Sequence, residues 1–295
     1  MEVAARAPLV TWLGATTASR DDWDGLLGGK AASLERLLRM GAPTPPAFCL
    51  TTEAFRAHLH APAHAHEADA AIGALPDRAA AQKLIDLLVN APLPEPLATE
   101  LDAGLRRLTA DEANARFAVR SSAVGEDGSR ASFAGIHETE LDLAADEVEG
   151  AVRRCWASLW SERALAYRAT RGVPLDGAMA VVVQRLIPAD AAAVAFTRHP
   201  VTGRADVVYL NAVRGLGEAL VSGTATPDEV VLSKADLAVL EVVIGGDERV
   251  LTDDQLRDLG RLSIDLERRF GGAIDIEAAH ADGEWYVLQA RPITA

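Results

Sequence analysis

The chain has 295 residues, of which 49% are hydrophobic and 24% charged, and its formal net charge is −14 at pH 7. This length and composition predict roughly two domains with ordinary hydrophobic cores, which excludes a wholly disordered protein. The acidic surplus repels phosphate backbones and disfavours nucleic acid as a partner, although metal ions and local cations can offset it for a small phosphate-bearing ligand.

The sequence contains no apolar stretch of roughly 20 residues, the length that a membrane-spanning helix needs. Residues 1–6 show no basic start followed by an apolar core, so we expect a cytoplasmic protein without a membrane partner. The two cysteines, Cys49 and Cys155, fit that compartment as reduced, buried thiols, with a single disulfide as the alternative.

Helical patterns dominate the first part of the chain. A short strand at residues 9–13 precedes Gly28-Gly29-Lys30, which opens a helix that ends before Gly41. A second strand at 48–50 leads into a helix capped by Thr52. The Ala- and Pro-rich segment 61–114 predicts peripheral helices joined by mobile linkers. A cluster of histidines lies at its start, and we expect a solvated connection there rather than a metal site: His58, His60, His64 and His66.

The middle of the chain combines a strand, a loop and a long helix. Residues 117–120 predict a short strand, and the Ser- and Gly-rich segment 121–135 predicts a loop whose backbone N–H groups can cradle phosphates. Apolar residues at helical spacing then predict one amphipathic helix over 146–170, closed by Gly172.

After residue 174 the apolar period changes from 3.6 to 2, which indicates strands. Thr252 and Gln255 form a capping box for a helix that ends at Gly271. The chain therefore predicts an α+β fold with an antiparallel second half. The strands are expected at 178–187, 191–197, 206–211, 229–232 and 238–244, with a short helix at 216–222.

The final segments, 273–279 and 284–290, predict a hairpin around Asp282-Gly283. Alternation places Asp275 with Glu277 on one face of the first strand, and Gln289 with Arg291 on one face of the second. A register that pairs these polar faces gathers oxygen ligands suited to Mg²⁺ beside a cation suited to phosphate. The alternative is a half-exposed sheet with ordinary polar alternation.

Taken in order, a series of motifs resembles the ATP-grasp domain of phosphoenolpyruvate synthase, pyruvate phosphate dikinase and rifampin phosphotransferase. The resemblance covers essentially the whole chain. The motifs lie at 28–34, 119–123, 126–127, 131–135, 181–184, 196–197, 200–203, 215–223, 226–228, 275–277 and 288–294.

The resemblance implies an ATP-grasp fold in which two lobes hold ATP between them. The first lobe is expected to comprise residues 1–175, with the glycine-lysine loop, a helical insert and the Arg-Ser-Ser loop. The second lobe, residues 176–295, is expected to be mainly an antiparallel sheet that carries the adenine and magnesium sites.

The resemblance also implies the site residues and the cofactors, which are ATP and Mg²⁺. Lys30, Arg120 and Arg291 are expected to be catalytic, and Glu277, Gln289 and Asp275 to hold the metal. The expected ATP-binding residues are Lys30, Arg120, Ser121, Gln184, Arg185, Leu186, Ile187 and Glu218.

The implied activity is that of an ATP-dependent phosphotransferase of dikinase type, which activates a phosphoryl group for a histidine carrier in trans or for a small-molecule acceptor. The alternatives are a stand-alone ATP-grasp kinase and a non-catalytic nucleotide-binding regulator. The chain departs from the family at Ala192-Ala193, where Ser-Gly is usual, and at His199, where Asp is usual. No phosphohistidine or acceptor-binding domain is recognisable, so we expect the acceptor to be supplied separately.

Overall fold

The computed structural model describes residues 7–112, 114–125, 138–221 and 223–293. The chain forms two compact units, one of residues 1–35 and 46–186 and the other of residues 36–45 and 187–295. The expected boundary after residue 175 differs from this division. Strand β5 (Met179–Arg185) pairs with strands of the first unit, so the division falls after it.

The first unit contains a five-stranded antiparallel sheet in the order β1-β2-β5-β3-β4. The strands expected near its start are present, and β3 continues past the expected end at Arg120 as far as Ala123. Residues 121–123 therefore lie in a strand and not in the predicted loop. The other strands are β1 (Val10–Trp12), β2 (Ala47–Leu50) and β4 (Thr139–Leu143).

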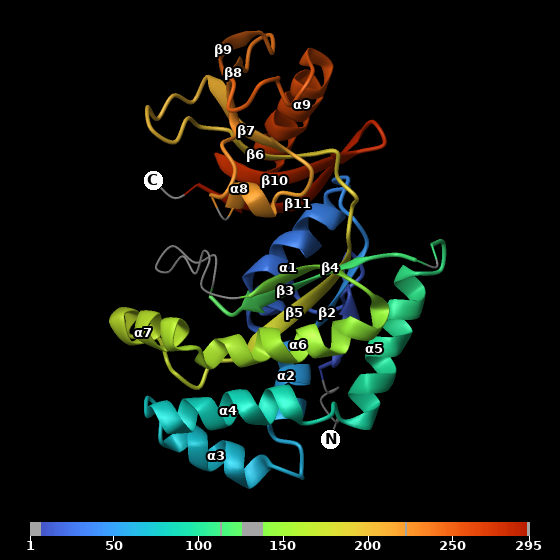
Figure 1. Ribbon diagram of the computed structural model, residues 1–295, viewed down its shortest axis with the longest axis vertical. Coiled ribbons are helices and arrows are strands. Elements are labelled where there is room, and N and C mark those ends of the chain that lie inside the picture. Colours follow the sequence, from blue (N-terminus) through green and yellow to red (C-terminus); the bar gives the residue numbers. More distant parts are fainter. Residues whose placement is uncertain (1–6, 113, 126–137, 222, 294–295) are drawn as a thin grey trace. The chain divides into compact units, whose positions relative to one another are not determined.

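Helices pack in successive layers against this sheet (Figure 1). Helix α6 contacts β3 and β5, α4 packs on α6, and α3 packs on α4. The helices expected over 61–114 are present in the outer layers, and Leu84, Leu88 and Leu97 on their inner faces are fully buried. The helices are α1 (Trp23–Arg39), α2 (Thr52–Leu59), α3 (Ala65–Gly73), α4 (Arg78–Asn90), α5 (Glu95–Leu108), α6 (Val148–Ala157) and α7 (Glu162–Arg171), with short 3-10 turns at Arg20–Asp22, Ala145–Glu147 and Ser158–Trp160.

Two of the clustered histidines belong to this helical core. His58 Nε2 lies 3.1 Å from the carbonyl oxygen of Leu88, and His64 Nε2 lies 2.8 Å from that of His58. Both rings are buried, so the expected solvated connection was wrong for these two. Within the described ranges, no group of three or more His, Cys, Asp or Glu side chains is arranged to hold a metal ion.

The helix expected over 146–170 is two helices with a break between them. Ser161 has extended backbone angles and its side chain accepts the N–H of Ala164, which starts α7 in a new direction. The break lets Trp156 and Trp160 both pack against Phe55 in the core.

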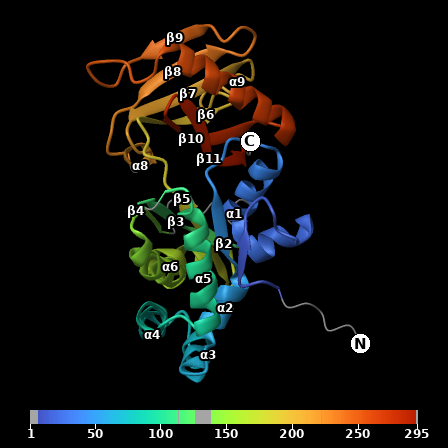
Figure 2. The ribbon, with the colours of Figure 1, turned by 90° about the vertical axis from the view of Figure 1, so that its right-hand side faces the viewer.

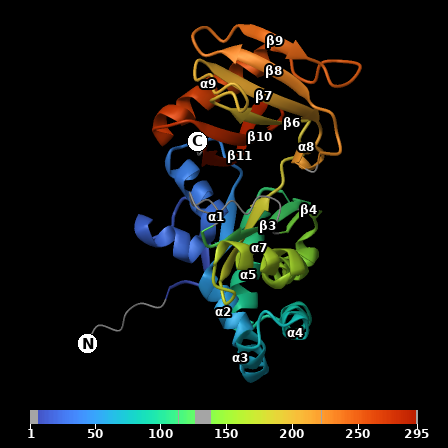
Figure 3. The ribbon, with the colours of Figure 1, turned by 90° about the vertical axis from the view of Figure 1, so that its left-hand side faces the viewer.

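The second unit contains a six-stranded antiparallel sheet in the order β11-β10-β6-β7-β8-β9, with helix α9 across one face (Figures 2 and 3). The strands expected at 178–187 and 191–197 belong to different sheets, because β5 lies between β2 and β3 in the first sheet and β6 between β10 and β7 in the second. The predicted capping box at Thr252 and the glycine end at Gly271 of α9 are confirmed. The elements are β6 (Ala191–Phe196), β7 (Val207–Arg214), α8 (Glu218–Val221), β8 (Asp228–Ser233), β9 (Val239–Val243), α9 (Asp253–Phe270), β10 (Ile274–Ala281) and β11 (Glu284–Pro292).

The two faces of the second sheet differ in character. Ile274 and Ile276 of β10 are fully buried on the face that α9 covers, together with Leu210 of β7. Asp275 and Glu277 point to the opposite side and are partly exposed. We call this side the open face. The α+β class and the antiparallel second half are confirmed.

Both cysteines are free and buried, as expected, and burial raises the pKa of each thiol. Among the described residues, no helix combines the length and apolar character needed to cross a membrane.

Candidate active site

The final hairpin has the register that gathers its polar side chains. Asp275 lies opposite Arg291, and Glu277 lies opposite Gln289. Along its other edge β10 pairs with β6. The β6 residues that lie opposite these two carboxylates are on the open face as well. The predicted pairing of the polar faces is therefore confirmed, and the reverse of the hairpin packs on α9 as its apolar alternation requires.

Asp275 holds the guanidinium of Arg291. The Nε–H of Arg291 is shared between the two carboxylate oxygens of Asp275, at 2.8 and 3.0 Å. The Asp275 side chain is 15% exposed and that of Arg291 36% exposed. Burial raises the pKa of Asp275, and the charge and hydrogen bond of Arg291 counteract that rise. The contact fixes Arg291 on the open face, where a cation can meet developing negative charge.

The donor set beside this pair fits Mg²⁺. Glu277 and Gln289 face each other across neighbouring strands, which brings their Cβ atoms to roughly 5 Å and their oxygen atoms into reach of one ion. One carboxylate and one amide oxygen suit a hard cation that completes its shell with phosphate oxygens and water.

Sequence reasoning did not single out Asn211 of β7. It lies opposite Val194, which in turn lies opposite Glu277, so all three share the open face. Its Oδ1 atom is buried and has no hydrogen-bond partner among the described residues. A buried, unpaired acceptor on this face is what a ligand or ordered water would satisfy. The period-2 pattern of β7 could have identified it.

The other end of the open face is apolar. Ile187, Ala279 and Ala281 form a small buried cluster against which Tyr286 and Leu288 pack. A bulge in β11 between the partners of Glu277 and Ala278 adds Leu288 to this face. Such a surface suits a flat, apolar ring system.

Helix α8 brings a carboxylate to the same end. A Cβ atom on Gly217 would lie 3.3 Å from Cβ of Ala192, which pairs with Ala279 on the open face. Glu218, the next residue, is exposed at the start of α8. The structure thus places Ile187 and Glu218, both predicted from the sequence, at one end of the face.

In the first unit, the glycine-lysine segment is fixed to strand β3. Gly28 interrupts α1 with φ of +69°, and a Cβ atom there would lie 2.0 Å from the carbonyl oxygen of Ser122. Ser122 Oγ donates to the carbonyl oxygen of Leu27 (2.7 Å) and accepts the N–H of Ala31 (3.0 Å). Only glycine permits this close approach.

This attachment brings two of the predicted cations to one region. Lys30 precedes Ala31, which Ser122 binds, and Arg120 lies two positions before Ser122 on the same face of β3. Ser121 lies on the opposite face, where it is fully buried and its Oγ has no partner among the described residues. Its side chain therefore does not join Lys30 and Arg120.

The remaining predicted nucleotide residues lie at the end of β5. Gln184 is buried opposite Ala118, on the same face of the sheet as Arg120. The backbone N–H groups of Arg185 and Leu186 bond to Pro46 and Arg116 of the first unit. Most of the predicted phosphate-cradling loop, residues 126–135, lies outside the described residues.

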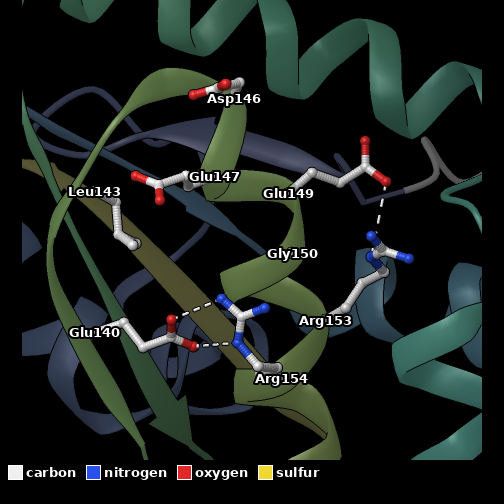
Figure 4. A pocket seen from close by; sticks show the side chains of 8 residues that line it. All are labelled: Glu140, Leu143, Asp146, Glu147, Glu149, Gly150, Arg153 and Arg154. Atoms are coloured by element: carbon white, nitrogen blue, oxygen red, sulfur yellow. Dashed lines mark hydrogen bonds and ion pairs between the residues drawn. The ribbon is translucent and has the colours of Figure 1, made fainter.

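A separate pocket of about 500 Å³ lies between β4 and α6 (Figure 4). Both of its arginines are paired with glutamates of the pocket lining. Arg154 contacts both carboxylate oxygens of Glu140 at 2.8 and 2.7 Å, and Arg153 lies 3.7 Å from Glu149. None of the predicted ATP or metal residues lines it.

Comparison with known proteins connects these features to a family. Residues 24–250 match the family described as pyruvate phosphate dikinase, AMP/ATP-binding domain. The prodigiosin synthesizing transferase PigC of Serratia marcescens is 38% identical over 91% of this chain, and the rifampicin phosphotransferase of Streptomyces sp is 36% identical over 91%. A probable phosphoenolpyruvate synthase of Methanocaldococcus jannaschii is 32% identical over 97%.

The chain spans only 31%, 40% and 26%, respectively, of the lengths of these three relatives. Among solved structures, the D-alanine–D-alanine ligase of Helicobacter pylori aligns with 70% of this chain and 55% of that chain, with 12% identity and a TM-score of 0.32, a likeness too weak to bear on the function. The extent of the family match and the identity to the relatives establish that this chain belongs to the pyruvate phosphate dikinase AMP/ATP-binding domain family.

Proposed function

We propose that this chain is the ATP-binding and ATP-splitting unit of a dikinase-type phosphotransferase, which passes a phosphoryl group to a histidine carrier in trans or to a small-molecule acceptor. The observation that carries the proposal is the order of groups on the open face of the second unit. An apolar cluster, a pair of oxygen ligands and a fixed guanidinium follow one another along β10 and β11.

Each group has a role in this proposal. The cluster around Ile187 receives the adenine ring, and Glu218 binds at the nucleoside end. Lys30 and Arg120 of the first unit bind the phosphates, and Ser122 holds the segment that carries Lys30 in place. Arg291 stabilises the charge that spreads over the phosphoryl oxygens as the bond breaks.

Glu277 and Gln289 would hold Mg²⁺, with Asn211 as a further oxygen on the same face. The ion, when bound, neutralises charge on the phosphate oxygens. Asp275 was expected to bind the metal as well, but its oxygens contact Arg291. We therefore propose that Asp275 acts mainly by orienting Arg291.

The relatives support phosphoryl transfer as the chemistry, because two of them are named as a phosphotransferase and a phosphoenolpyruvate synthase. A nucleotide-binding regulator needs no such set of transfer groups, and the presence of Arg120, Arg291 and the metal pair argues against that alternative.

The products of ATP turnover test the proposal. The purified chain is incubated with Mg²⁺ and ATP, and the nucleotides are separated by chromatography. We expect AMP when a phosphohistidine-domain protein is supplied as carrier. ADP formed with a small molecule and no second protein would instead identify a stand-alone kinase. Nucleotide binding without any turnover under either condition would refute both enzymatic functions.

A further inference from the structure

One row of side chains crosses the open face at the level of the proposed metal ligands. Glu277 of β10 lies opposite Gln289 of β11 on one side and opposite Val194 of β6 on the other. Val194 lies opposite Asn211 of β7, which lies opposite Glu229 of β8. Residues directly opposite each other in an antiparallel sheet share a face. Asn211 therefore belongs to the same row as the metal pair, with one valine between.

The spacing of this row allows Asn211 to serve the same ion as Glu277. Two strand spacings put their Cα atoms about 10 Å apart. Val194, which separates them, has a short side chain and is partly exposed. Mg²⁺ takes oxygen ligands at about 2.1 Å and keeps several waters, so Glu277 can bind it directly and Asn211 directly or through one of these waters. In either case the amide oxygen of Asn211, and not its nitrogen, has to face the ion.

Tyr209 and Glu229 contact the side chain of Asn211. Tyr209 precedes Asn211 by two positions and so lies on the same face of β7. Its hydroxyl group donates to Glu229 Oε2 at 2.7 Å. Burial and Glu229 raise the pKa of Tyr209 to about 12, and a hydrogen bond from the side-chain amide of Asn211 opposes that rise. A hydrogen bond that lowers the pKa of a phenol is one donated to its oxygen, so the donor is Nδ2 of Asn211.

The directions of these hydrogen bonds are consistent with one another. The ionised carboxylate of Glu229 can only accept, so it engages the hydroxyl hydrogen of Tyr209. The hydroxyl oxygen is then left to accept, and the amide of Asn211 can donate to it only through Nδ2. Oδ1 of Asn211 is thereby turned away from Tyr209. It is buried and has no hydrogen-bond partner among the described residues, as expected of an acceptor whose partner is a ligand.

Without Tyr209 and Glu229 the amide of Asn211 has two orientations. In the reversed one, Nδ2 and its two hydrogens take the place of Oδ1. These hydrogens carry partial positive charge, so they repel a cation and cannot coordinate it. The hydroxyl group of Tyr209 and the carboxylate of Glu229 therefore determine which end of the amide the row presents.

We propose that Tyr209 and Glu229 are positioning residues for the divalent cation of the ATP site, because they keep the oxygen of Asn211 turned towards that cation. Glu229 acts on Tyr209, and Tyr209 acts on Asn211. This inference rests on the proposed function, and it extends the cation site across the sheet as far as β8. Partners of this kind, which orient a ligand without binding the metal, commonly set metal affinity in proteins.

The test measures how much Mg²⁺ tightens nucleotide binding. A non-hydrolysable ATP analogue is titrated into the purified chain by isothermal titration calorimetry, once with saturating Mg²⁺ and once with EDTA. The ratio of the two dissociation constants is the metal-dependent gain in affinity. Tyr209→Phe should lower this gain about tenfold, because it releases the amide of Asn211, and should leave the affinity in EDTA unchanged. A wild-type gain in Tyr209→Phe would overturn the proposal.

Asn211→Asp separates orientation from folding. A carboxylate presents an oxygen in either orientation, so the gain no longer depends on the hydroxyl group of Tyr209. Adding Tyr209→Phe to Asn211→Asp should therefore change the gain by less than about twofold. A purely structural role for the hydroxyl group predicts the same loss in both backgrounds, and equal losses would contradict the positioning role.

Glu229→Ala tests the outer end of the arrangement. Without the carboxylate, the hydroxyl hydrogen of Tyr209 is released and can donate to Oδ1 of Asn211, which favours the reversed amide. The metal-dependent gain should fall as it does in Tyr209→Phe. Because Glu229 is exposed, the fold should be retained, which circular dichroism checks. A folded Glu229→Ala variant with the wild-type gain would refute the role of Glu229.

Tyr167→Phe and Arg261→Ala serve as matched controls. The first removes a tyrosine hydroxyl group from α7 of the first unit, where the ring lies beside Arg171. The second breaks an exposed ion pair on α9. Both should keep the wild-type gain. A comparable loss in either control would overturn the assignment, because the effect would then not be specific to the row that contains Asn211.

The wild-type chain is measured first, which separates the two proposals. A chain that does not bind the analogue, or binds it equally well with Mg²⁺ and with EDTA, contradicts the proposed function itself. A clear wild-type gain that persists in Tyr209→Phe and in Glu229→Ala contradicts only the positioning role of these two residues.

Discussion

Removing Arg291 should leave a poorly solvated carboxylate without its cation. Asp275 is only 15% exposed, and burial already raises its pKa although Arg291 opposes that effect. In Arg291→Ala the carboxylate keeps its burial and loses the attraction. The variant should therefore be less stable than the wild type, and a second substitution, Asp275→Asn, should restore part of the lost stability.

The size of the expected stability loss follows from the contact between Asp275 and Arg291. One Nε–H group is shared between two carboxylate oxygens at 2.8 and 3.0 Å, which is one charge-assisted hydrogen bond rather than a two-pronged clamp. Such a bond contributes roughly 1.5–3 kcal/mol when it is removed from one side only. Because Arg291 is 36% exposed and water partly replaces it, we expect a loss at the lower end, about 1–2 kcal/mol.

The stability lost in Arg291→Ala should also depend on pH, and the titration of Asp275 determines whether the loss grows or shrinks as the pH rises. Without Arg291 its pKa rises further, so the folded variant binds a proton that the unfolded chain releases. The destabilisation of Arg291→Ala relative to the wild type should then be largest near about pH 7 and smaller near about pH 5.

Urea unfolding at both pH values, followed by circular dichroism, measures these differences. Arg261→Ala is the matched control, because its pair with Asp258 lies on α9 of the same unit with side chains 65% and 59% exposed. It should cost less than about 1 kcal/mol at either pH. A double variant, Asp275→Asn with Arg291→Ala, that is less stable than Arg291→Ala at neutral pH would refute the reasoning.

Four further predictions concern activity and stability. Arg291→Ala should lower ATP turnover by about 10²–10³-fold, since in the proposed function it removes the cation that stabilises the transferring phosphoryl group, and unchanged turnover in a folded variant would contradict that proposed role. Glu277→Ala should shift the Mg²⁺ dependence of turnover to higher concentration; a wild-type metal titration would exclude Glu277 as a ligand. Gly28→Ala should destabilise the chain by at least about 1–2 kcal/mol in urea unfolding, because its φ of +69° disfavours a side chain and the new Cβ would overlap Ser122. Burial lowers the pKa of His58, so stability should fall as the pH drops below about 6.5, and His58→Gln should flatten that slope.

Local rules predicted the second unit well. Thr252 and Gln255 cap α9, and Gly271 ends it, because these contacts involve residues that are close in sequence. The hairpin register was predicted for a similar reason. A short turn joins strands whose apolar faces must both meet the core, so their polar faces coincide.

Distant packing decides what composition and periodicity leave open. The Ala-rich segment 61–114 has a composition typical of a peripheral insert, and only the structure shows that Leu84 and Leu97 of its helices are fully buried. The strands at 178–187 and 191–197 follow each other closely in the sequence, but they belong to different sheets. Period-2 alternation identifies a strand and does not identify its partner.

The sequence by itself determined the chemistry available to this protein: the motif order, the cations, the paired polar residues of the hairpin and the glycine that precedes Lys30. Those features follow from residue type, spacing and turn geometry, which the chain carries locally. Only the tertiary structure decided that Ser122 and not Ser121 holds the glycine-lysine segment, and that Asp275 contacts Arg291. It also decided that His199 joins Phe196 and Tyr209 at one end of the open face, because contacts between separate strands depend on how the sheet is assembled.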